Sequence, residues 1–238
     1  MKLLEDFLPV LRARTITFLK SRQESGDVVS FEFEKHDDMT WKPGQHGVFM
    51  FPRKRVKGLP FRGFSIASSP REEVLRIATR IRPRPSDFKK QLLRLDIGDA
   101  VRIRGPFGPF YLTRDDLAVA FIAGGIGITP FLGLLRDCRL RPEKLPLPAH
   151  LFYSAVGSVH AFKKEIEDIR GQLPGLHATY VPHREELLQR LNPFVAEQQN
   201  RALYYISGPG AMIRSMRHYL RRQGVAARNI HTEWFLGY

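Results

Sequence analysis

The chain has 238 residues, of which 43% are hydrophobic and 26% are charged. This composition is ordinary for a globular protein and argues against a disordered chain, while the length allows one large or two modest domains. The formal net charge is +14. Such a charge attracts acidic proteins, nucleic acids or anionic ligands, or it simply marks a solvated basic surface.

Several function classes find no support in the sequence. No segment approaches the roughly twenty apolar residues that a membrane span needs, so we expect a cytoplasmic protein. Cys138 is the only cysteine, which excludes disulfides and cysteine-ligated clusters within this chain. The eight histidines show no metal-ligand spacing, and no metal site is expected.

Residues 1–115 are predicted to form an antiparallel β-barrel. Apolar and polar residues alternate in segments 29–34, 75–82 and 101–104, which is typical of antiparallel strands with one face toward solvent. Turn-forming Gly and Pro residues separate the segments, as they do in small barrels. One helix is expected from Ser86, with Ser86 as its N-cap.

The most informative segment is 117–130, LAVAFIAGGIGITP. The apolar run predicts a strand that is covered on both faces, and the glycines after it allow a sharp turn and the close approach of a ligand. Pro130 suits the first turn of a helix, whose N-terminus attracts anions. The segment therefore predicts a phosphate cradle, although a tight turn without a ligand uses similar residues.

Residues 116–238 are predicted to form a doubly wound parallel sheet. Further strands are expected at 149–154, 176–181, 202–207 and 230–235, and helical patterns lie between them. Ligands in such sheets bind beyond the carboxyl ends of the strands. The expected architecture is thus a two-domain α+β protein, a barrel with one capping helix (1–115) followed by a parallel α/β domain (116–238).

Five motifs, in this order, resemble the ferredoxin-NADP reductase superfamily of flavoprotein reductases. They are Arg62-Gly63-Phe64-Ser65, Gly105-Pro106-Phe107-Gly108, the glycine run 124–130, Gly208-Pro209 followed by Met212, and residues 232–238. The resemblance runs from about Arg14 to Tyr238. It implies an FAD-binding barrel, with FMN less favoured, and an NAD(P)-binding second domain.

The resemblance assigns flavin-binding roles to two segments. In Arg62-Gly63-Phe64-Ser65 the guanidinium binds flavin phosphate, which its fork suits, the Phe64 ring packs against the flavin, and the Ser65 hydroxyl lies near flavin N5. A second segment carries Thr79, Ser86 and Phe88, with phosphate held at Ser86 and the helix N-terminus. There Pro83 stands where the family usually has glycine.

The resemblance also assigns a nicotinamide side. Gly125, Gly127 and Thr129 would border the dinucleotide pyrophosphate, and Gly208, Pro209 and Met212 follow the nicotinamide position. Many relatives have a cysteine before the Gly-Pro pair, where this chain has Ser207. Because hydride transfer depends on geometry more than on acid–base chemistry, we expect serine to tune the rate without abolishing it.

The C-terminus supplies two further candidate residues. In relatives that end on an aromatic residue, the ring covers the flavin face where nicotinamide stacks, and Tyr238 is expected to act in this way. Glu233 is expected near N5 as a proton or orientation group. The alternative is a polar tail without function.

The preferred dinucleotide is less clearly indicated. Relatives that prefer NADPH often carry an arginine soon after the position of Ser154, where this chain has Ala155-Val156-Gly157. Basic side chains that could instead reach a 2′-phosphate are His160, Lys163, Arg214 and Arg217. NADPH is slightly favoured over NADH.

The predicted activity is an NAD(P)H-dependent flavoprotein reductase that transfers hydride to FAD and passes electrons to a separate acceptor. The basic surface favours an acidic ferredoxin or flavodoxin. Alternatives are a ferric-chelate or small-molecule reductase and an electron-relay subunit. A basic nucleic-acid-binding barrel is the rival from another class, but it leaves the glycine cradle and Tyr238 without a role.

Overall fold

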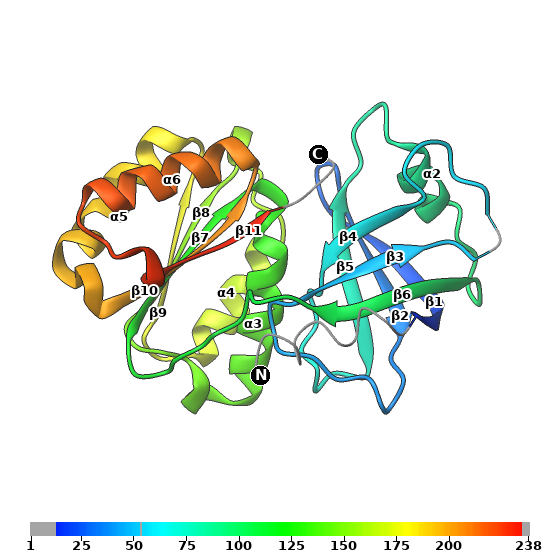
Figure 1. Ribbon diagram of the computed structural model, residues 1–238, viewed down its shortest axis with the longest axis horizontal. Helices are drawn as coiled ribbons and strands as arrows, with labels where there is room; N and C mark the ends of the chain where they lie inside the picture. The colour runs from blue at the N-terminus through cyan, green and yellow to red at the C-terminus, as the bar shows by residue number, and fades with distance from the viewer. Residues whose placement is uncertain (1–12, 53, 235–238) are drawn as a thin grey trace.

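Two β-sheets with their helices make up the computed structural model, which describes residues 13–52 and 54–234 (Figure 1). The first sheet is antiparallel, and its end strands β4 and β5 contact each other, as in a barrel. The second sheet is parallel and has helices on both faces. The expected fold class is confirmed.

The antiparallel sheet has the order β4-β3-β6-β1-β2-β5. Its strands are β1 (Ala13–Ser25), β2 (Val28–Glu34), β3 (His46–Met50), β4 (Phe61–Ser65), β5 (Val74–Arg80) and β6 (Ala100–Phe107). Phenylalanines fill its core, among them the fully buried Phe31, Phe33 and Phe49. Burying such large rings is the main gain in free energy for a small barrel.

Strand β2 differs from the expected half-exposed strand. Ser30 and Glu32, which the alternation assigns to a wet face, are 2% and 8% exposed. The Glu32 carboxylate is paired with Arg76 on β5 and with Lys20 on β1. The polar face of β2 is therefore buried because charged neighbours cover it, which period-two alternation cannot reveal.

Helix α2 (Asp87–Leu93) caps the barrel on the side away from the parallel sheet (Figure 1). Ser86 occupies the N-cap position, as expected, but its side chain makes no capping hydrogen bond. Phe88 and Leu92 are buried. The helix thus closes the barrel with its apolar face, and its other face carries exposed basic residues.

The parallel sheet has the order β11-β10-β7-β8-β9. Its strands are β7 (Ala118–Gly124), β8 (Ala149–Ser154), β9 (Leu176–Val181), β10 (Ala202–Gly208) and β11 (Ile230–Trp234). The α-helices are α3 (Thr129–Leu140), α4 (Lys163–Gln172), α5 (Arg184–Gln198) and α6 (Gly210–Arg222). Short 3-10 helices are η2 (Gly125–Ile128), η3 (Pro142–Lys144), η4 (Val156–Ser158), η5 (Gln199–Arg201) and η6 (Ala227–Asn229).

Strand β7 is buried along its whole length. Phe121 and Ala123 belong to the apolar cluster formed with α3 and α4, whereas Ala120 and Ile122 belong to the cluster formed with α5 and α6. Alternate residues of one strand therefore serve two cores, which explains why the run has no polar alternation.

The two sheets are joined by an apolar contact through α3. Phe110 and Ala67 lie in the same cluster as Phe131 of α3. At Gly133 the helix comes so close to the barrel that an added Cβ would lie 2.6 Å from the carbonyl oxygen of Ile66. The α3–barrel distance therefore depends on a glycine at this position.

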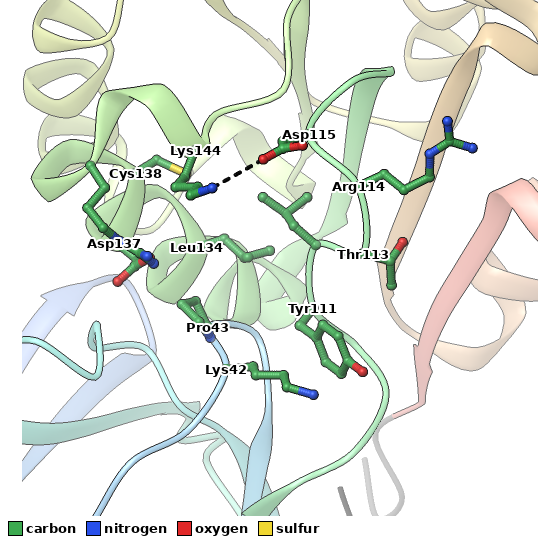
Figure 2. A pocket seen from close by; sticks show the side chains of 12 residues that line it. Lys42, Pro43, Tyr111, Thr113, Arg114, Asp115, Leu134, Asp137, Cys138 and Lys144 are labelled. Carbon is green, nitrogen blue, oxygen red and sulfur yellow. Dashed lines mark hydrogen bonds and ion pairs between the residues drawn. The ribbon is translucent and has the colours of Figure 1, made fainter. Parts of the chain in front are cut away.

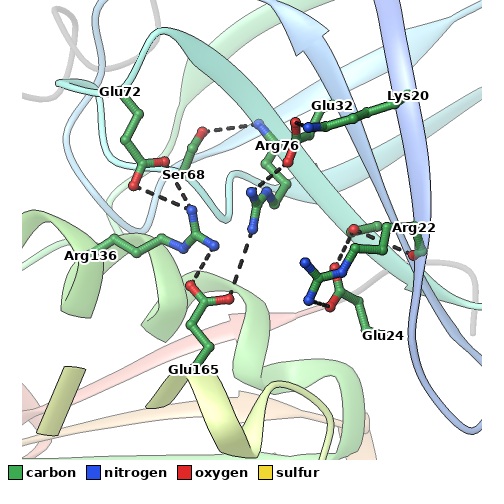
Figure 3. Close-up of polar contacts among 10 residues, drawn as sticks. Lys20, Arg22, Glu24, Glu32, Ser68, Glu72, Arg76, Arg136 and Glu165 are labelled. Atoms are coloured by element: carbon green, nitrogen blue, oxygen red, sulfur yellow. Dashed lines mark hydrogen bonds and ion pairs between the residues drawn. The ribbon is translucent and has the colours of Figure 1, made fainter. Parts of the chain in front are cut away.

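A cluster of charged side chains forms a second link between the sheets (Figure 3). Arg136 on α3 is 7% exposed and pairs with Glu72 from the barrel and with Glu165 on α4. Glu165 also faces Arg76 of β5 at 3.9 Å. The cluster thus ties β5 to α3 and α4, and buried charges of this kind hold a defined geometry only when all partners are present.

Candidate functional site

The glycine loop after β7 lies against the end of β10. A Cβ on Gly127 would overlap the backbone of Ser207 and Gly208, and one on Gly124 would overlap the Met212 sulfur. Gly125 has φ +55°, in the left-handed region. The loop enters η2 before α3 begins, with Pro130 in the first helical turn. The glycines therefore allow backbone to approach backbone at the carboxyl end of the sheet.

Four polar residues come together between the domains. Ser65, Ser207 and Glu233 were predicted site residues, and His46 was not. Ser207 is the register partner of Glu233 on β11, and Ser65 on β4 is the register partner of His46 on β3. His46 Nδ1 lies 3.2 Å from Glu233 Oε1. This contact joins the barrel to the parallel sheet at the point where the flavin and nicotinamide motifs meet.

Three polar side chains here, Ser65, Ser207 and Glu233, form what we call the buried polar cluster. They are 1%, 0% and 6% exposed. Ser65 Oγ, Ser207 Oγ and Glu233 Oε2 have no hydrogen-bond partner of regular geometry among the described residues. Leaving such a group unsatisfied costs about 1–3 kcal/mol, so the cluster indicates a site for a polar ligand.

The environment of Glu233 favours its protonated form. Burial raises the pKa of this carboxyl, and the hydrogen bond and charge of His46, together with the nearby Ser65 hydroxyl, oppose that rise. The net direction is upward. Glu233 can therefore hold a proton inside the domain interface.

The arginine motif on β4 lies beside open space. No atom lies within 4 Å of where a Gly63 Cβ would be. Arg62 donates to the carbonyl oxygens of Leu59 and Phe61, stacks over the Phe88 ring at 5.8 Å and leaves its buried Nε unpartnered among the described residues. The guanidinium is thus held by backbone and ring, with a donor still available for an anion.

The aromatic part of this prediction needs a correction. Phe64 is 2% exposed and packs against Phe49 and Phe88, and Phe88 itself is fully buried. Thr79 is also fully buried, on β5. Phe64 and Phe88 belong to the barrel core because the inward faces of β4 and α2 must be apolar to close the barrel, and Thr79 is buried beside them as a polar side chain. Of these residues, the backbone is therefore the part that could contact a ligand.

Ser86 lies among basic neighbours, and we call this part of the barrel the basic corner. Ser86 is exposed. Lys89 donates to the carbonyl oxygen of Arg80. Burial, and then the guanidinium groups of Arg82 and Arg62, lower the pKa of Lys89 to about 8. Cations held this close together fit an anionic ligand, whose charge would relieve their repulsion.

A second unpredicted feature is a cavity of about 260 Å³ where the β1–β2 turn meets the glycine loop. Arg80 uses its Nε to bind both oxygens of Asp27, and its Nη1 lies 3.8 Å from where a Gly125 Cβ would be. Val156 and Tyr153 line the opposite wall. Arg80 thus lies directly beside the predicted phosphate cradle.

The remaining predicted nicotinamide residues lie around the same strand ends. The Thr129 hydroxyl is buried and donates to the Ile126 carbonyl at 2.6 Å, so it stabilises the turn. Pro209 is exposed at the N-cap of α6. Gly208 and Met212 pack against Gly124.

The candidate 2′-phosphate residues are only partly available. His160 is buried, and its ring nitrogens lie within hydrogen-bond distance of three carbonyl oxygens, those of Ser158, Tyr153 and Val181. It therefore has no capacity left for phosphate, which corrects that prediction. Lys163 lies over the Tyr180 ring at 4.8 Å. Arg214 and Arg217 are exposed on α6.

A larger cavity of about 450 Å³ lies elsewhere, between residues 111–115 and α3 (Figure 2). Its charged lining residues include the pair Lys144–Asp115. It contains none of the predicted site residues. Tyr238 and residues 235–237 lie outside the described part of the chain, so the expectation for Tyr238 stays a prediction.

Within residues 13–52 and 54–234, none of the helices combines the length and the apolar character that crossing a bilayer requires.

Comparison with known proteins tests these expectations. Residues 121–218 match the family model described as the oxidoreductase NAD-binding domain. The ferredoxin-NADP+ reductase of Plasmodium falciparum (H286L mutant) superposes with a TM-score of 0.80 at 17% identity, covering 94% of this chain and 96% of that one. The chain has the fold of the ferredoxin-NADP reductase superfamily. The two-domain fold that the five motifs implied is thereby confirmed.

Two further similarities extend this result. The FAD/NAD-binding domain of nitric oxide dioxygenase from Vibrio cholerae has this reductase fold as well, with a TM-score of 0.75 at 21% identity over 93% of this chain and 98% of that one. A flavohemoprotein of Chromobacterium violaceum is 29% identical over 93% of the chain. The chain spans about 60% of the length of that relative.

His46 is the residue that sequence reasoning missed most clearly. It stands in Lys42-Pro43-Gly44-Gln45-His46, where Pro-Gly indicated only a turn. A histidine after a turn carries no signal of its own. Its role becomes visible only once β11 of the reductase fold brings Glu233 to it.

Proposed function

We propose that this chain is an NAD(P)H-dependent flavoprotein reductase that binds FAD between the barrel and the parallel sheet. The buried polar cluster carries the proposal, because buried polar atoms without a hydrogen bond of regular geometry at the meeting point of two domains favour polar ligand atoms there. The oxidoreductase NAD-binding domain supports the nicotinamide part. The Vibrio cholerae domain, described as FAD/NAD-binding, supports the flavin part.

The residues present fit a flavin. Arg62, with its unpartnered Nε, and the basic corner around Lys89 would hold the phosphates. The open space beside Gly63 would admit the ring system. When bound, FAD would accept a hydride from nicotinamide and release the electrons to an acceptor.

The chain's own residues would then bind, orient and exclude water. The glycine loop and Arg80 would hold the dinucleotide pyrophosphate at the N-terminus of η2 and α3. Ser65 and Ser207 would orient the two rings through their hydroxyl groups, and Glu233 would hold a proton at Oε2. Burial of all three keeps bulk water from the reacting atoms.

Cofactor reconstitution tests the proposal. The purified protein, incubated with FAD and desalted, should be yellow and should bleach under NADPH or NADH in the absence of oxygen and of any other enzyme. Arg62→Ala should weaken FAD binding, whereas Arg102→Ala, a matched change at an exposed barrel residue, should not. A protein that stays colourless with both FAD and FMN would refute the proposal.

Tyr238 provides a second test of the same site. If its ring occupies the nicotinamide position, Tyr238→Ser should tighten nicotinamide binding and alter the visible spectrum of the bound flavin. Titration of the flavin spectrum with NADP+ and NAD+ measures both effects. Unchanged spectrum and affinity would show that Tyr238 is not a placeholder.

An electron-relay subunit is the second candidate. The matched relatives contain this region within chains of about 1.7 times its matched length, which favours delivery of electrons to a further module. Turnover of ferricyanide by the isolated protein with NAD(P)H would support an independent reductase. Bleaching without turnover would support the relay subunit.

A further inference from the structure

Two histidines from separate parts of the chain meet at the edge of the parallel sheet. His150 is the second residue of β8, His177 is the second residue of the end strand β9, and the two are register partners. We propose that His150 and His177 form a binding site for a divalent transition-metal ion, with the highest affinity for Cu²⁺. The site goes beyond the proposed function, because it lies where these strands begin, whereas the dinucleotide is expected beyond their carboxyl ends.

The separation of the two rings fits two ligands of one ion. Their centroids are 5.7 Å apart. Imidazole nitrogens bind such ions at about 2.0–2.1 Å, which places the centroids of two bound rings about 4.5–6 Å apart. Register partners on adjacent strands carry their side chains on the same face of the sheet. The pair can therefore close on an ion by side-chain rotation, without a change in the backbone.

The His150 ring is held in place and has one nitrogen engaged. Nε2 lies 2.8 Å from Thr179 Oγ1. The ring also stacks on that of Phe152, with centroids 4.0 Å apart and planes 10° from parallel. Metal-binding histidines commonly donate a hydrogen bond from one ring nitrogen to a neighbouring oxygen, which leaves the other nitrogen for the ion. With Nε2–H donating to Thr179, Nδ1 of His150 is the ligand atom.

The surroundings of His150 favour the neutral imidazole, which is the form that binds a metal ion. Burial, and then the charge of His177, lower the pKa of His150 to about 4. At neutral pH no proton therefore has to leave His150 before an ion binds.

The basic side chains near the pair are engaged on the other face of β9. Lys163 lies over the Tyr180 ring at 4.8 Å, and Arg170 pairs with Glu167 on α4. Tyr180 packs against the apolar cluster formed with α3 and α4. Because side chains alternate along a strand, His177, three positions before Tyr180, lies on the opposite face. These cations thus have partners of their own across the strand from the histidines.

The pair is accessible from solvent. His177 is exposed, and both histidines line an open cavity of about 450 Å³ at this edge of the sheet. Among the described residues, no group of three or more His, Cys, Asp or Glu side chains is placed to share a metal. Two imidazoles would thus be the protein ligands, and water would complete the coordination. Such a site favours Cu²⁺, which binds nitrogen ligands most tightly among the divalent first-row ions.

The first experiment uses the full chain without flavin. Pulsed EPR after addition of one equivalent of Cu²⁺ counts the bound imidazoles, and titration against a copper indicator gives the Kd. We expect two imidazoles in the wild type and one in His177→Gln. The affinity of this variant should be at least about 10-fold lower, because a chelating pair becomes a single ligand.

The controls separate this site from other binding. His218→Gln, at an exposed position on α6, should bind Cu²⁺ as the wild type does. Zn²⁺ should compete with Cu²⁺, whereas Mg²⁺, which prefers oxygen ligands, should not. One imidazole or none in the wild type, or an unchanged affinity in His177→Gln, would overturn the site.

Thr179 provides a second experiment, because it is expected to position His150 without touching the ion. Thr179→Val keeps the size of the side chain but loses the hydroxyl, so the affinity for Cu²⁺ should fall by about 10-fold while two imidazoles stay bound. Thr179→Ser, which retains the hydroxyl, should restore the wild-type affinity. Equal affinities in all three proteins would contradict the assignment of Nδ1 as the ligand atom.

The outcomes are independent of the proposed function. Cu²⁺ binding is measured without FAD or NAD(P)H, so a protein that stays colourless with flavin can still contain the metal site. If flavin binds and is reduced but Cu²⁺ binds with fewer than two imidazoles, the metal site alone is wrong.

Discussion

At the scale of single residues, the domain interface changes the protonation of Glu233. Burial raises the pKa of its carboxyl, and His46, from the other domain, opposes the rise. Glutamate in the unfolded chain has its ordinary pKa. At pH values between this pKa and the raised pKa of the folded state, the folded chain therefore keeps a proton that the unfolded chain has lost. The contribution of this proton to stability is complete below the unfolded pKa and is lost as pH rises through the folded value.

Glu233→Gln should therefore become more stable relative to wild type as pH rises. The difference in the free energy of unfolding between variant and wild type should grow as pH rises above the ordinary glutamate pKa of about 4.3, because the variant has no buried carboxyl to ionise. Urea denaturation across this range measures it. Glu185→Gln, at an exposed helix position, should show no such trend. A constant difference for Glu233→Gln would contradict the raised pKa.

At the scale of elements, α3 is the part of the parallel domain that sets its distance from the barrel. Gly133 provides close approach to Ile66, and Arg136, one turn further, provides charge pairing with Glu72 and Glu165. The first contact depends on the lack of a side chain, and the second on a complete set of partners. Both can be tested by single substitutions.

Gly133→Ala should destabilise the protein by about 1–3 kcal/mol, because the new methyl group must push α3 away from a backbone carbonyl. Gly171→Ala is the matched control, since it also lies in a helix but has nothing within 4 Å of the added Cβ. That control should gain about 0.5–1 kcal/mol from helix propensity. Chemical denaturation of both variants measures these changes in the free energy of unfolding. Equal changes in the two variants would show that α3 does not lie this close to the barrel.

Arg136→Met should cost about 3–5 kcal/mol in the free energy of unfolding, because it removes a buried guanidinium and leaves the partly buried carboxylates of Glu72 and Glu165 without this partner. Arg170→Met removes an exposed pair with Glu167 on α4 and should cost less than about 1 kcal/mol. Urea denaturation compares the two. A small effect at Arg136 would mean that Arg76 alone compensates Glu165.

At the scale of the whole molecule, basic residues gather on the barrel around α2, away from the parallel sheet. The exposed ones are Arg55, Lys57, Arg82, Arg84, Lys90 and Arg94. The backbone N–H of Lys57 donates to Asp87, which anchors this loop to the start of α2. This surface is compatible with an acidic electron carrier, one of the acceptors that the sequence favours.

Electron transfer to an acidic ferredoxin or flavodoxin should accordingly depend on ionic strength. Its kcat/KM should fall several-fold between low and physiological salt, because the Debye length shrinks to about 8 Å. Lys90→Glu should weaken this reaction, whereas Arg222→Glu, at the end of α6 in the other domain, should not. Reduction of a small neutral quinone serves as the salt-insensitive reference. Salt-independent kinetics with the carrier would exclude electrostatic docking.

The predictable parts of this protein are those that depend on local pattern. Segment 117–130 predicted a buried strand and a helix with Pro130 in its first turn, because apolar runs, glycine and proline act over a few residues. Phe64 was assigned to the flavin by its place in the Arg62-Gly63-Phe64-Ser65 motif, and a motif cannot say whether an inward ring meets a ligand or packs into the core. His160 was misjudged because its ring nitrogens face the carbonyl oxygens of Ser158, Tyr153 and Val181, and the way the chain folds back to place these oxygens around the ring cannot be inferred from residue types.

The sequence by itself determined the two sheets, their order along the chain and the glycine loop, since each depends on residue types at short spacing. Only the tertiary structure decided which side chains share the site. The pairing of Ser207 with Glu233, the contact of Glu233 with His46, and the proximity of Arg80 to Gly125 all join segments far apart in the chain. The first of these contacts arises from strand pairing within the parallel sheet and the other two from the packing of one domain on the other, and no short-range pattern encodes them.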